Sequence, residues 1–474
     1  MRLGYWKSPK ATGNPLAVII ITMKNIVDDQ RTFFNTNTTK NVDFRIHQLK
    51  KFYRVLKENE PLLNEAIYAD FKKSAFENYL SELGLLYHDI QDAIKKVKRW
   101  SKAKRVGTNF INFPAKSYVL AEPLGVSLII GAWNYPYQLS LAPIVAALAA
   151  GNTVVLKPSE LPANTSHTMA KIISENFEAN YFTVVEGGIP ETTALLEQKF
   201  DKIFFTGSVP VGKIIYQAAA KHLTPVTLEL GGKSPAFITE NCDLEVSVKR
   251  LIWAKFLNAG QTCIAPDYVF VHKTVKDKFL ELAKLEIEKS HLSFDNGNYV
   301  QIIDEKNTRR LVDMIDVQKV FCGGVHDLSS RYIEPTILKD ITFEDKVMQD
   351  EIFGPVLPVI DYEDVNEAIQ LVKSRPKPLS CYVFTKDKKI KKKLLTEISF
   401  GGGAVNDALM HITNSHLPFG GVGESGIGAY HGEKGFKAFT HYKSVLEKPT
   451  WFEPNVKYYP HTDRKLKWIK RILG

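Results

Sequence analysis

The sequence predicts an α/β protein built from two parallel-sheet domains. Three observations lead to this prediction: the length, an alternation of apolar runs with helical segments, and a second start of that alternation after Gly231. At 474 residues the chain exceeds one ordinary domain. Hydrophobic residues make up 44% of it and charged residues 24%, proportions that favour a packed globular fold over disorder.

The amino-terminal residues precede the alternating pattern. Residues 16–21 form a short apolar run behind Lys7 and Lys10. The run is too short to span a bilayer, and no clear small-residue cleavage site follows it. We therefore expect residues 1–22 to be a disordered extension ahead of a start near Met23, with a degenerate signal peptide as the alternative.

The next part of the chain changes from helical to alternating. Apolar residues at helical spacing predict helices over residues 29–103. Strands are then expected at residues 126–130, 153–156, 181–186, 203–205 and 226–230. Helices are expected between them, at residues 139–150, 165–177, 192–198 and 211–222. Strands that are apolar throughout indicate a parallel sheet covered on both faces, an architecture typical of nucleotide-binding proteins.

The alternation starts again after Gly231. Helices are expected at residues 244–257, 275–290, 365–372 and 388–398, and strands at 268–271 and 380–384. This pattern predicts a second α/β domain. The glycine-rich stretches at residues 401–403 and 420–432 predict loops with close backbone approach.

Charge and cysteine content narrow the function classes. The formal net charge of +10 comes from 62 basic residues dispersed among 52 acidic ones. No helix-turn-helix, zinc-finger or RNA-binding signature is present, so no nucleic-acid partner is expected. The four cysteines form no Cys-x-x-Cys pair, which argues against disulfides and metal sites and indicates a reducing compartment. Each cysteine is then a buried apolar residue or a reactive thiol.

Cys263 ends the run Asn-Ala-Gly-Gln-Thr-Cys, which follows a predicted helix. Gly260 permits a sharp reversal of the chain there. A thiol on such a loop can meet substrate, and its reactivity would require a pKa below the ~8.5 of a free thiol. Taken alone, Cys263 is either a nucleophile or a core cysteine.

Glu229 lies between two leucines at the end of an apolar strand. A carboxylate in that position is costly unless it is paired or functional. It is either satisfied by backbone donors or a general base whose pKa is raised by burial. The residue pattern alone leaves both interpretations open.

Polar residues also follow two neighbouring predicted strands, at the edge where parallel sheets bind ligands. Asn134 can donate to a developing oxyanion, or it forms a turn before Pro136. Glu160 can accept from ribose hydroxyls with Lys157 as a matching donor, or both belong to a solvated loop.

Gly207 and Gly212 stand at a strand–turn–helix junction that also holds Ser208. Backbone amides at such a helix N-terminus favour phosphate. The spacing differs from Gly-x-Gly-x-x-Gly, so this motif alone is a weak phosphate signal.

Together these segments resemble the aldehyde dehydrogenase superfamily over residues 32–443, and most of all its class 3, fatty or medium-chain branch. The matching segments follow the family's order, at residues 133–136, 157–160, 205–212, 228–235, 260–266, 351–355 and 418–432. Two departures are visible. Glu424 stands where the branch often has asparagine, and the membrane-spanning tail of the fatty-aldehyde members is absent.

The resemblance implies two Rossmann-like domains and a small oligomerisation arm. Residues 23–104 and 124–229 would form the NAD(P)-binding domain, and residues 230–412 the catalytic domain. Residues 105–123 and 413–474 would form the arm and a C-terminal segment.

The resemblance also implies the roles of individual residues. Cys263 would be the nucleophile, Glu229 the general base, and Asn134 with the Cys263 amide the oxyanion hole. The implied cofactor-binding residues are Trp133, Lys157, Glu160, Gly207, Ser208, Gly212, Glu351 and Phe353. NAD is expected to bind better than NADP without excluding it, because Glu160 would repel a 2′-phosphate that Lys157 would attract.

The implied function is NAD(P)-dependent oxidation of aldehydes to carboxylic acids. Medium- or long-chain aliphatic or aromatic aldehydes are expected, because no basic cluster near the motifs would hold a second carboxylate. Trp133, Tyr135 and Tyr137 either line an apolar entrance or pack in the core. The alternatives are a coenzyme A-acylating relative or acyl reductase, and a catalytically silent structural or membrane-scaffold protein.

A cytoplasmic homodimer is expected, with an exposed strand at residues 118–121 as part of its arm. The basic, amphipathic residues 465–474 would cover the substrate mouth, make a peripheral contact with an anionic membrane, or pack on their own domain.

Overall fold

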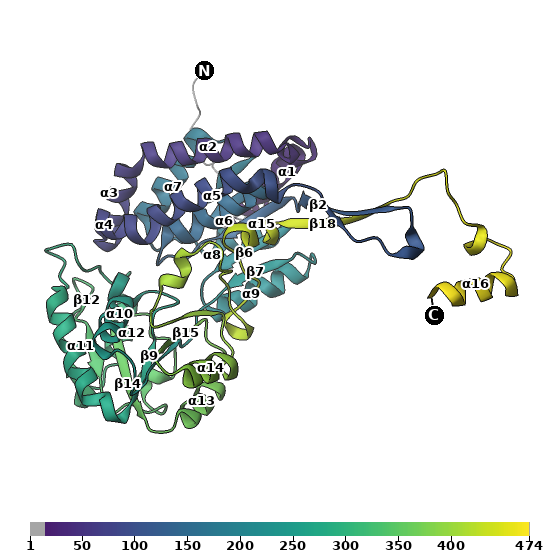
Figure 1. The fold of residues 1–474 in the computed structure, drawn as a ribbon. Coiled ribbons are helices and arrows are strands. Elements are labelled where there is room, and N and C mark those ends of the chain that lie inside the picture. Colours follow the sequence, from purple (N-terminus) through teal and green to yellow (C-terminus); the bar gives the residue numbers. More distant parts are fainter. Residues whose placement is uncertain (1–14, 474) are drawn as a thin grey trace, which may run out of the picture.

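The protein is described by a computed structural model that places residues 15–473. Figure 1 shows two sheet-centred bodies and a long arm that carries the C-terminal helix away from both of them. A six-stranded and a seven-stranded sheet form the bodies, and a three-stranded sheet forms the arm. The predicted α/β class is therefore confirmed, whereas the exact domain boundaries stay predictions.

Helices form the first part of the described chain. They are α1 (Pro15–Asn35), α2 (Val42–Glu58), α3 (Glu60–Phe71), α4 (Ala75–Asn78), the π-helix η2 (Tyr79–Leu83) and α5 (Gly84–Trp100). Residues 1–14 of the expected disordered extension lie outside the described residues. The expectation is wrong for residues 15–22, which belong to α1, because Ile19 and Ile20 pack against the core of the first sheet.

The first sheet has the strand order β17-β7-β6-β3-β4-β5. Its strands are β3 (Val126–Ile130), β4 (Thr153–Lys157), β5 (Phe182–Val184), β6 (Lys202–Thr206), β7 (Val226–Glu229) and β17 (Gly426–Ile427). All pairings are parallel except that of β17 with β7. The connecting helices are α6 (Pro136–Ala150), α7 (Ala163–Asn176), α8 (Ile189–Leu196) and α9 (Val209–Ala220).

The strands β3, β4 and β6 are buried over their whole lengths, as expected for a sheet covered on both faces. Their carboxyl ends lie at one edge of the sheet, where Asn134, Lys157, Gly207 and Glu229 end or follow the strands. This edge is where parallel sheets place ligands.

The second sheet has the order β10-β13-β14-β9-β8-β15-β16. Its strands are β8 (Pro235–Ile238), β9 (Tyr268–His272), β10 (Val320–Cys322), β13 (Thr336–Leu338), β14 (Val356–Tyr362), β15 (Ser380–Phe384) and β16 (Gly402–Val405). Its principal helices are α10 (Leu244–Phe256), α11 (Lys276–Ser290), α12 (Glu305–Val312), α13 (Val365–Lys373) and α14 (Lys388–Glu397). The sheet is parallel apart from β10, so the second start of the alternation is a second parallel sheet.

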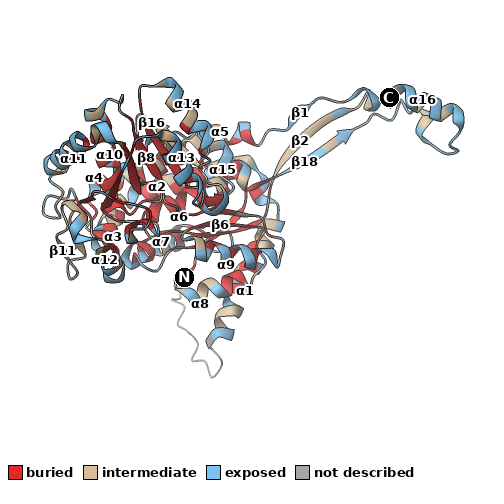
Figure 2. Ribbon diagram, turned by 90° about the horizontal axis from the view of Figure 1, so that it is seen from below, coloured by how far each residue is buried: buried red, intermediate tan, exposed pale blue. Residues whose placement is uncertain are grey.

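The arm is the antiparallel sheet of β1 (Lys104–Val106), β2 (Lys116–Pro123) and β18 (Thr440–Glu447). Figure 2 shows mainly exposed and intermediate residues along it, in contrast to the buried sheets. Helix α16 (Asp463–Leu473) follows at its far end, so the alternative in which the C-terminal segment packs on its own domain is wrong for residues 465–473, and residue 474 lies outside the described residues. The described helices include none that is long and apolar enough to cross a membrane.

Candidate active site

A cavity of about 660 Å³ lies at the carboxyl edge of the first sheet and reaches the second. It brings together nearly all of the residues singled out in the sequence. They are Trp133, Asn134, Lys157, Glu160, Gly207, Ser208, Glu229, Cys263, Glu351 and Phe353. Since these residues come from segments far apart in the sequence, their convergence supports a shared site.

Cys263 follows a tight turn that ends α10. Asn258, Ala259 and Gly260 have φ angles of 55°, 50° and 71°, so three consecutive residues are left-handed. A Cβ on Gly260 would lie 2.3 Å from the Gly354 carbonyl oxygen, and glycine is therefore required there. The expected chain reversal is confirmed, and it turns the thiol into the cavity between the two sheets.

The environment of the thiol differs from the expectation. Burial raises the pKa of the Cys263 thiol, and the neighbouring Glu351 and Glu229 carboxylates raise it further. A reactive thiol requires a pKa below that of a free thiol, and the burial of Cys263 between the two sheets acts in the opposite direction. Thiolate formation at this position is therefore favoured by rising pH or by a proton acceptor beside the sulfur.

Glu229 is the last residue of β7 and is only 3% exposed. Neither carboxylate oxygen has a hydrogen-bond partner within residues 15–473, so the interpretation that backbone donors satisfy it is wrong. Burial alone raises the pKa of Glu229 well above its ordinary value. A buried, unpartnered carboxyl group beside a thiol has the properties expected of an acid–base residue.

Asn134 is held at the same site by the turn that precedes Cys263. Its Nδ2 donates to the Gln261 carbonyl oxygen at 3.0 Å, and its own carbonyl oxygen accepts from the Asn258 Nδ2 at 2.9 Å. An asparagine amide has two N–H groups, so one remains to donate into the cavity. This fits the oxyanion role better than the turn role.

Lys157 and Glu160 form the wall beyond β4. The Lys157 ammonium donates to the Pro158 carbonyl oxygen at 2.7 Å and lies 3.4 Å from the Glu160 carboxylate. Burial lowers the pKa of Lys157, whereas the Glu160 side chain is half exposed. The solvated-loop alternative therefore does not describe Lys157, whose side chain is 2% exposed.

Only part of the strand–turn–helix junction at Gly207, Ser208 and Gly212 lines the cavity. Gly207 and Ser208 line the cavity, and the Gly207 amide donates to the Glu229 carbonyl oxygen at 3.0 Å. Gly212 does not line it; a Cβ there would lie 2.7 Å from a Leu230 methyl group. This glycine allows α9 to pack closely on the sheet. The neighbouring Val211 lines the cavity, and the place of Gly212 beside the cofactor stays a prediction.

Glu351 and Phe353 close the cavity from the second sheet. A Cβ on Gly231 would lie 2.0 Å from the Glu351 Oε2, so the carboxyl group lies directly against the chain that follows Glu229. Burial raises the pKa of Glu351 to about 8. The Phe353 and Trp133 rings meet edge to face with their centroids 5.2 Å apart.

The two tyrosines of the neighbouring segment differ in role from Trp133. Tyr137 is fully buried and donates to the Leu63 carbonyl oxygen at 2.7 Å. The Tyr135 hydroxyl lies 2.6 Å from the hydroxyl of Thr262, the residue that precedes Cys263. Tyr137 is therefore a packing residue, and Tyr135 connects the two sides of the site.

Comparison with known proteins identifies this arrangement. The model of the aldehyde dehydrogenase family matches residues 22–445. The chain belongs to the aldehyde dehydrogenase family. It is 45% identical to the 4,4'-diaponeurosporen-aldehyde dehydrogenase of Staphylococcus aureus (strain NCTC 8325 / PS 47) over 94% of this chain and 98% of that protein.

Two further aldehyde dehydrogenases place the chain within the family. The dimeric NADP-preferring aldehyde dehydrogenase of Rattus norvegicus is 43% identical over 90% of this chain and 95% of its own. The substrate-bound structure of Staphylococcus aureus AldH has a TM-score of 0.93 and 44% identity, covering 95% of this chain and 99% of that one. Other relatives are family 3 aldehyde dehydrogenases, so the class 3 resemblance is confirmed.

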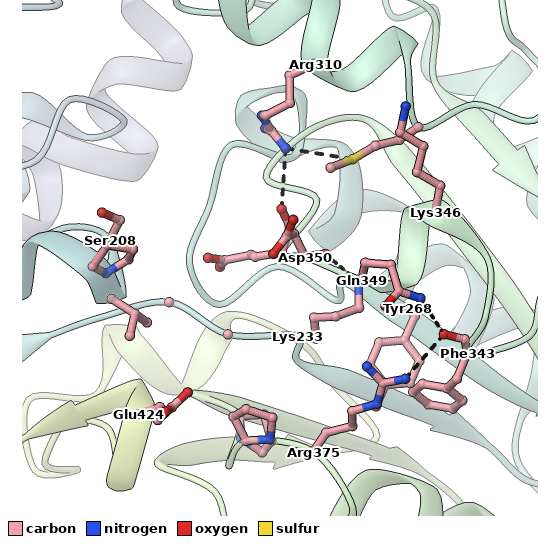
Figure 3. Close-up of a pocket in the computed structure, with 18 of the residues that line it drawn as sticks. Ser208, Lys233, Tyr268, Arg310, Phe343, Lys346, Gln349, Asp350, Arg375 and Glu424 are labelled. Atoms are coloured by element: carbon pink, nitrogen blue, oxygen red, sulfur yellow. Dashed lines mark hydrogen bonds between the residues drawn. The ribbon is translucent and has the colours of Figure 1, made fainter.

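A second cavity of this aldehyde dehydrogenase, about 1140 Å³ in volume, was not anticipated (Figure 3). It adjoins the first, since Ser208, Gly231, Arg310 and Glu351 line both. Its cationic side chains come from distant segments: Lys233, Lys306, Arg309, Arg310, Lys346, Arg375 and Lys377. The expectation that no basic cluster lies near the motifs is therefore wrong. The cluster gave no signal in the sequence, because its residues come together only in the folded chain.

Several of these cations are already engaged by the protein. The Lys233 ammonium contacts the Asp267 carboxylate at 2.5 Å, and Arg310 donates to the Ile352 carbonyl oxygen at 2.8 Å. The Arg375 guanidinium lies 5.0 Å from the centroid of the Phe343 ring. Acidic residues, Glu424 among them, share the walls, so the cavity has mixed charge.

Proposed function

We propose that this aldehyde dehydrogenase oxidises hydrophobic aldehydes to carboxylic acids through a covalent intermediate on Cys263. The observation that carries the proposal is the buried Glu229, whose carboxyl group has no partner among the described residues and shares a cavity with Cys263 and Asn134. A base at this position suits an intermediate that water must hydrolyse.

The residues support each chemical step. The Cys263 thiolate adds to the aldehyde carbon, and the Asn134 amide with the Cys263 N–H stabilises the oxyanion that forms. Bound NAD(P) supplies the acceptor for the hydride, which leaves a thioester on Cys263. Glu229 then takes a proton from a water molecule while the water attacks the thioester, and the carboxylic acid and the Cys263 thiol are released.

The cavity fits a dinucleotide. Its outer end is lined by the apolar side chains of Ile189, Val211 and Ile214, which are exposed at 78%, 41% and 59%. Apolar side chains open to solvent within a cavity suit a flat ring such as adenine. Lys157 and Glu160 lie along the same wall, where ribose hydroxyls would find a donor and an acceptor.

The decisive test replaces the nucleophile. Cys263→Ala should abolish NADH formation from aldehydes while NAD binding is retained. Substantial dehydrogenase turnover by this variant would contradict the assignment. A strict requirement for coenzyme A would favour the acylating alternative, and the absence of both turnover and NAD binding in the wild type would favour a silent scaffold.

The proposed substrates are medium- or long-chain aliphatic or aromatic aldehydes. The relatives' names support this class, since one acts on a diaponeurosporen aldehyde. Catalytic efficiency should rise with chain length from acetaldehyde towards decanal. A profile that peaked at acetaldehyde or succinic semialdehyde would overturn the proposal, and the cationic second cavity makes the semialdehyde the more informative control.

Both cofactors are proposed to bind, with NAD preferred. The Glu160 side chain is half exposed and would repel a 2′-phosphate. The Lys157 ammonium, which would attract it, is buried and lies 3.4 Å from the Glu160 carboxylate. The rat relative is named as NADP-preferring, so the balance is testable. Calorimetric dissociation constants should favour NAD, and Glu160→Gln should shift them towards NADP; a lower constant for NADP in the wild type would contradict the preference.

We propose a homodimer assembled through the arm. The tip of the arm exposes Phe110 and Phe113 at 82% and 65%, and Trp451 on the segment after β18 at 76%. Exposed aromatic residues of this kind are typical of association surfaces. Light scattering at assay concentrations should give the mass of a dimer, and a monomer would refute the proposal.

A peripheral membrane contact through α16 and a cytoplasmic location are further proposals. The helix carries basic residues and exposes Leu466 and Trp468, a composition that suits an anionic lipid surface. The four free cysteines suit a reducing compartment. Sedimentation with anionic vesicles tests the first proposal, and cell fractionation tests the second; recovery in the vesicle-free supernatant or an oxidising compartment would contradict them.

A further inference from the structure

Three ionisable side chains are buried in one short segment beneath the active site. Lys73 and Glu82 are 0% exposed and Glu77 is 8% exposed. They lie between α3 and α5, and Glu82 belongs to the π-helix η2. Burying charges costs free energy, and π-helical turns are frequent at functional sites, so this segment needs an explanation.

On one side of the segment, Glu82 binds the first turn of α6. The Glu82 Oε1 accepts from the Lys73 ammonium at 2.8 Å. Its Oε2 accepts from the backbone N–H groups of Tyr137 at 2.8 Å and Gln138 at 3.3 Å. These amides open α6, which begins two residues after Asn134, and the Lys73 ammonium lies 4.6 Å from the centroid of the Tyr135 ring.

The other side of the segment holds the turn before the nucleophile. The Glu77 Oε1 accepts from the Asn258 N–H at 3.0 Å. The Asn258 Nδ2 in turn donates to the carbonyl oxygens of Asn134 at 2.9 Å and Gln261 at 3.2 Å. Glu77 therefore fixes the left-handed turn that carries Cys263.

The two oxyanion donors belong to different bodies of the molecule. Asn134 follows a strand of the first sheet, whereas Cys263 lies between α10 and β9 of the second. Figure 1 places α3 and α4 where the two bodies meet, and the Gln301 N–H donates to the Phe71 carbonyl oxygen across that boundary at 2.7 Å. The separation of the donors thus depends on contacts between the bodies.

We infer that Lys73, Glu77 and Glu82 are positioning residues, which hold the Asn134 amide and the Cys263 N–H at the spacing that the oxyanion requires. The inference rests on the proposed function, because it assigns these donors to the transition state. Burial raises the pKa of Glu77, so a neutral side chain with the same acceptor should replace it without loss.

The test compares variants of Glu77 with a matched carboxylate elsewhere. Glu77→Ala removes the acceptor for Asn258, and Glu77→Gln keeps an oxygen in its place. Asp201 is the control, since its carboxylate also accepts from a backbone N–H, that of Val126, at 2.8 Å. Asp201 precedes β6, at the opposite edge of the sheet from the cavity.

A shift of about 1 Å in a catalytic group can cost about 100-fold in rate. Glu77→Ala should therefore lower kcat by about 30- to 100-fold, while the aldehyde KM and the NAD dissociation constant change by less than about threefold. Glu77→Gln should retain kcat within about threefold of the wild type. Asp201→Ala should lower the unfolding midpoint and leave kcat of the folded enzyme unchanged.

Equal kcat values for Glu77→Ala and the wild type would overturn the inference. So would a loss in Glu77→Gln as large as that in Glu77→Ala. If Glu77→Ala does not fold, Lys73→Met and the charge-balanced Lys73→Met/Glu82→Gln decide: the double variant should recover kcat relative to the single one, and no recovery refutes the role. Wild-type turnover tests the proposed function separately from all of these ratios.

Discussion

Glu229→Gln is the sharpest test of the hydrolytic half of the reaction. The substitution keeps the side-chain volume and replaces the carboxylate, which can accept a proton, with an amide, which cannot. Because neither oxygen of Glu229 has a partner among the described residues, no hydrogen bond within the protein is lost. Burial already raises the pKa of Glu229, so the protein gains a neutral amide where a charge is unfavourable. Folding should therefore be unaffected, and any loss of activity reports on the chemistry.

The expected loss follows from what a positioned base contributes. General acid–base catalysis is worth about 10²- to 10⁴-fold, which corresponds to roughly 3–5 kcal/mol at 1.36 kcal/mol per tenfold change. Rapid mixing of Glu229→Gln with NAD and aldehyde should give a burst of about one NADH per active site, followed by slow turnover limited by thioester hydrolysis. The burst should be visible as nicotinamide absorbance.

Two results would refute this reasoning. Steady-state turnover within about tenfold of the wild type would show that Glu229 is not the base for hydrolysis. A slow variant without a burst would show that its role lies before hydride transfer. A normal unfolding midpoint for Glu229→Gln is the control that makes either result interpretable.

Other measurements address separate features. Asn134→Ala should lower kcat by about 10²- to 10³-fold, as the loss of an oxyanion donor does, and calorimetry should find NAD affinity unchanged. Activity should rise with pH into the alkaline range, because burial raises the pKa values of both Cys263 and Glu229 and their deprotonated forms react; a pH–rate profile that falls above neutrality would contradict this. Burial lowers the pKa of Lys202 to about 7 from the ~10.4 of an exposed lysine. The buried charge therefore destabilises the folded state at low pH, and the free energy of unfolding rises as pH increases from about 7 to ~10.4. Lys202→Met should therefore raise the unfolding midpoint more at about pH 6 than at about pH 9, and the opposite order would refute the sign.

The periodic parts of the fold could be predicted from the sequence because their signals are local. The strands at residues 126–130 and 380–384 match β3 and β15 residue for residue. The strand β14 was missed, since Pro358 interrupts its apolar run and a proline argues against a central strand. The structure accommodates Pro358 where the pairing partner changes, opposite Leu338 of β13, with the pairing to β9 starting at Val359.

The prediction of disorder for residues 15–22 was wrong for a different reason. Its apolar run is short, and nothing in the local pattern shows that Ile19 and Ile20 meet the core of the first sheet. Helices of this kind are stabilised by tertiary packing more than by their own propensity. Local patterns therefore underestimate order at a terminus that packs on a distant part of the chain.

The site shows the same division between local and distant signals. Cys263, Glu229 and Asn134 could be proposed because each stands in a distinctive short motif, and the family resemblance joined them. Lys73, Glu77 and Glu82 stand in no such motif; in the sequence they are ordinary charged residues of a helical region. The contact of Glu77 with Asn258 exists only once the two bodies are packed together. The contact of Glu82 with the start of α6 lies within the first body, but it joins residues 55 positions apart in the sequence.

This difference follows from how the oxyanion hole is built. One donor comes from each sheet, so the chemistry depends on a distance that no single domain sets. The segment that reaches both donors is buried, with Glu82 on the Asn134 side and Glu77 on the Cys263 side. A buried carboxylate needs a charge partner, which Lys73 supplies to Glu82. The role of these residues therefore depends on how the two bodies pack against each other. It can be recognised only in the structure, where hydrogen bonds from one segment reach both sides of the site.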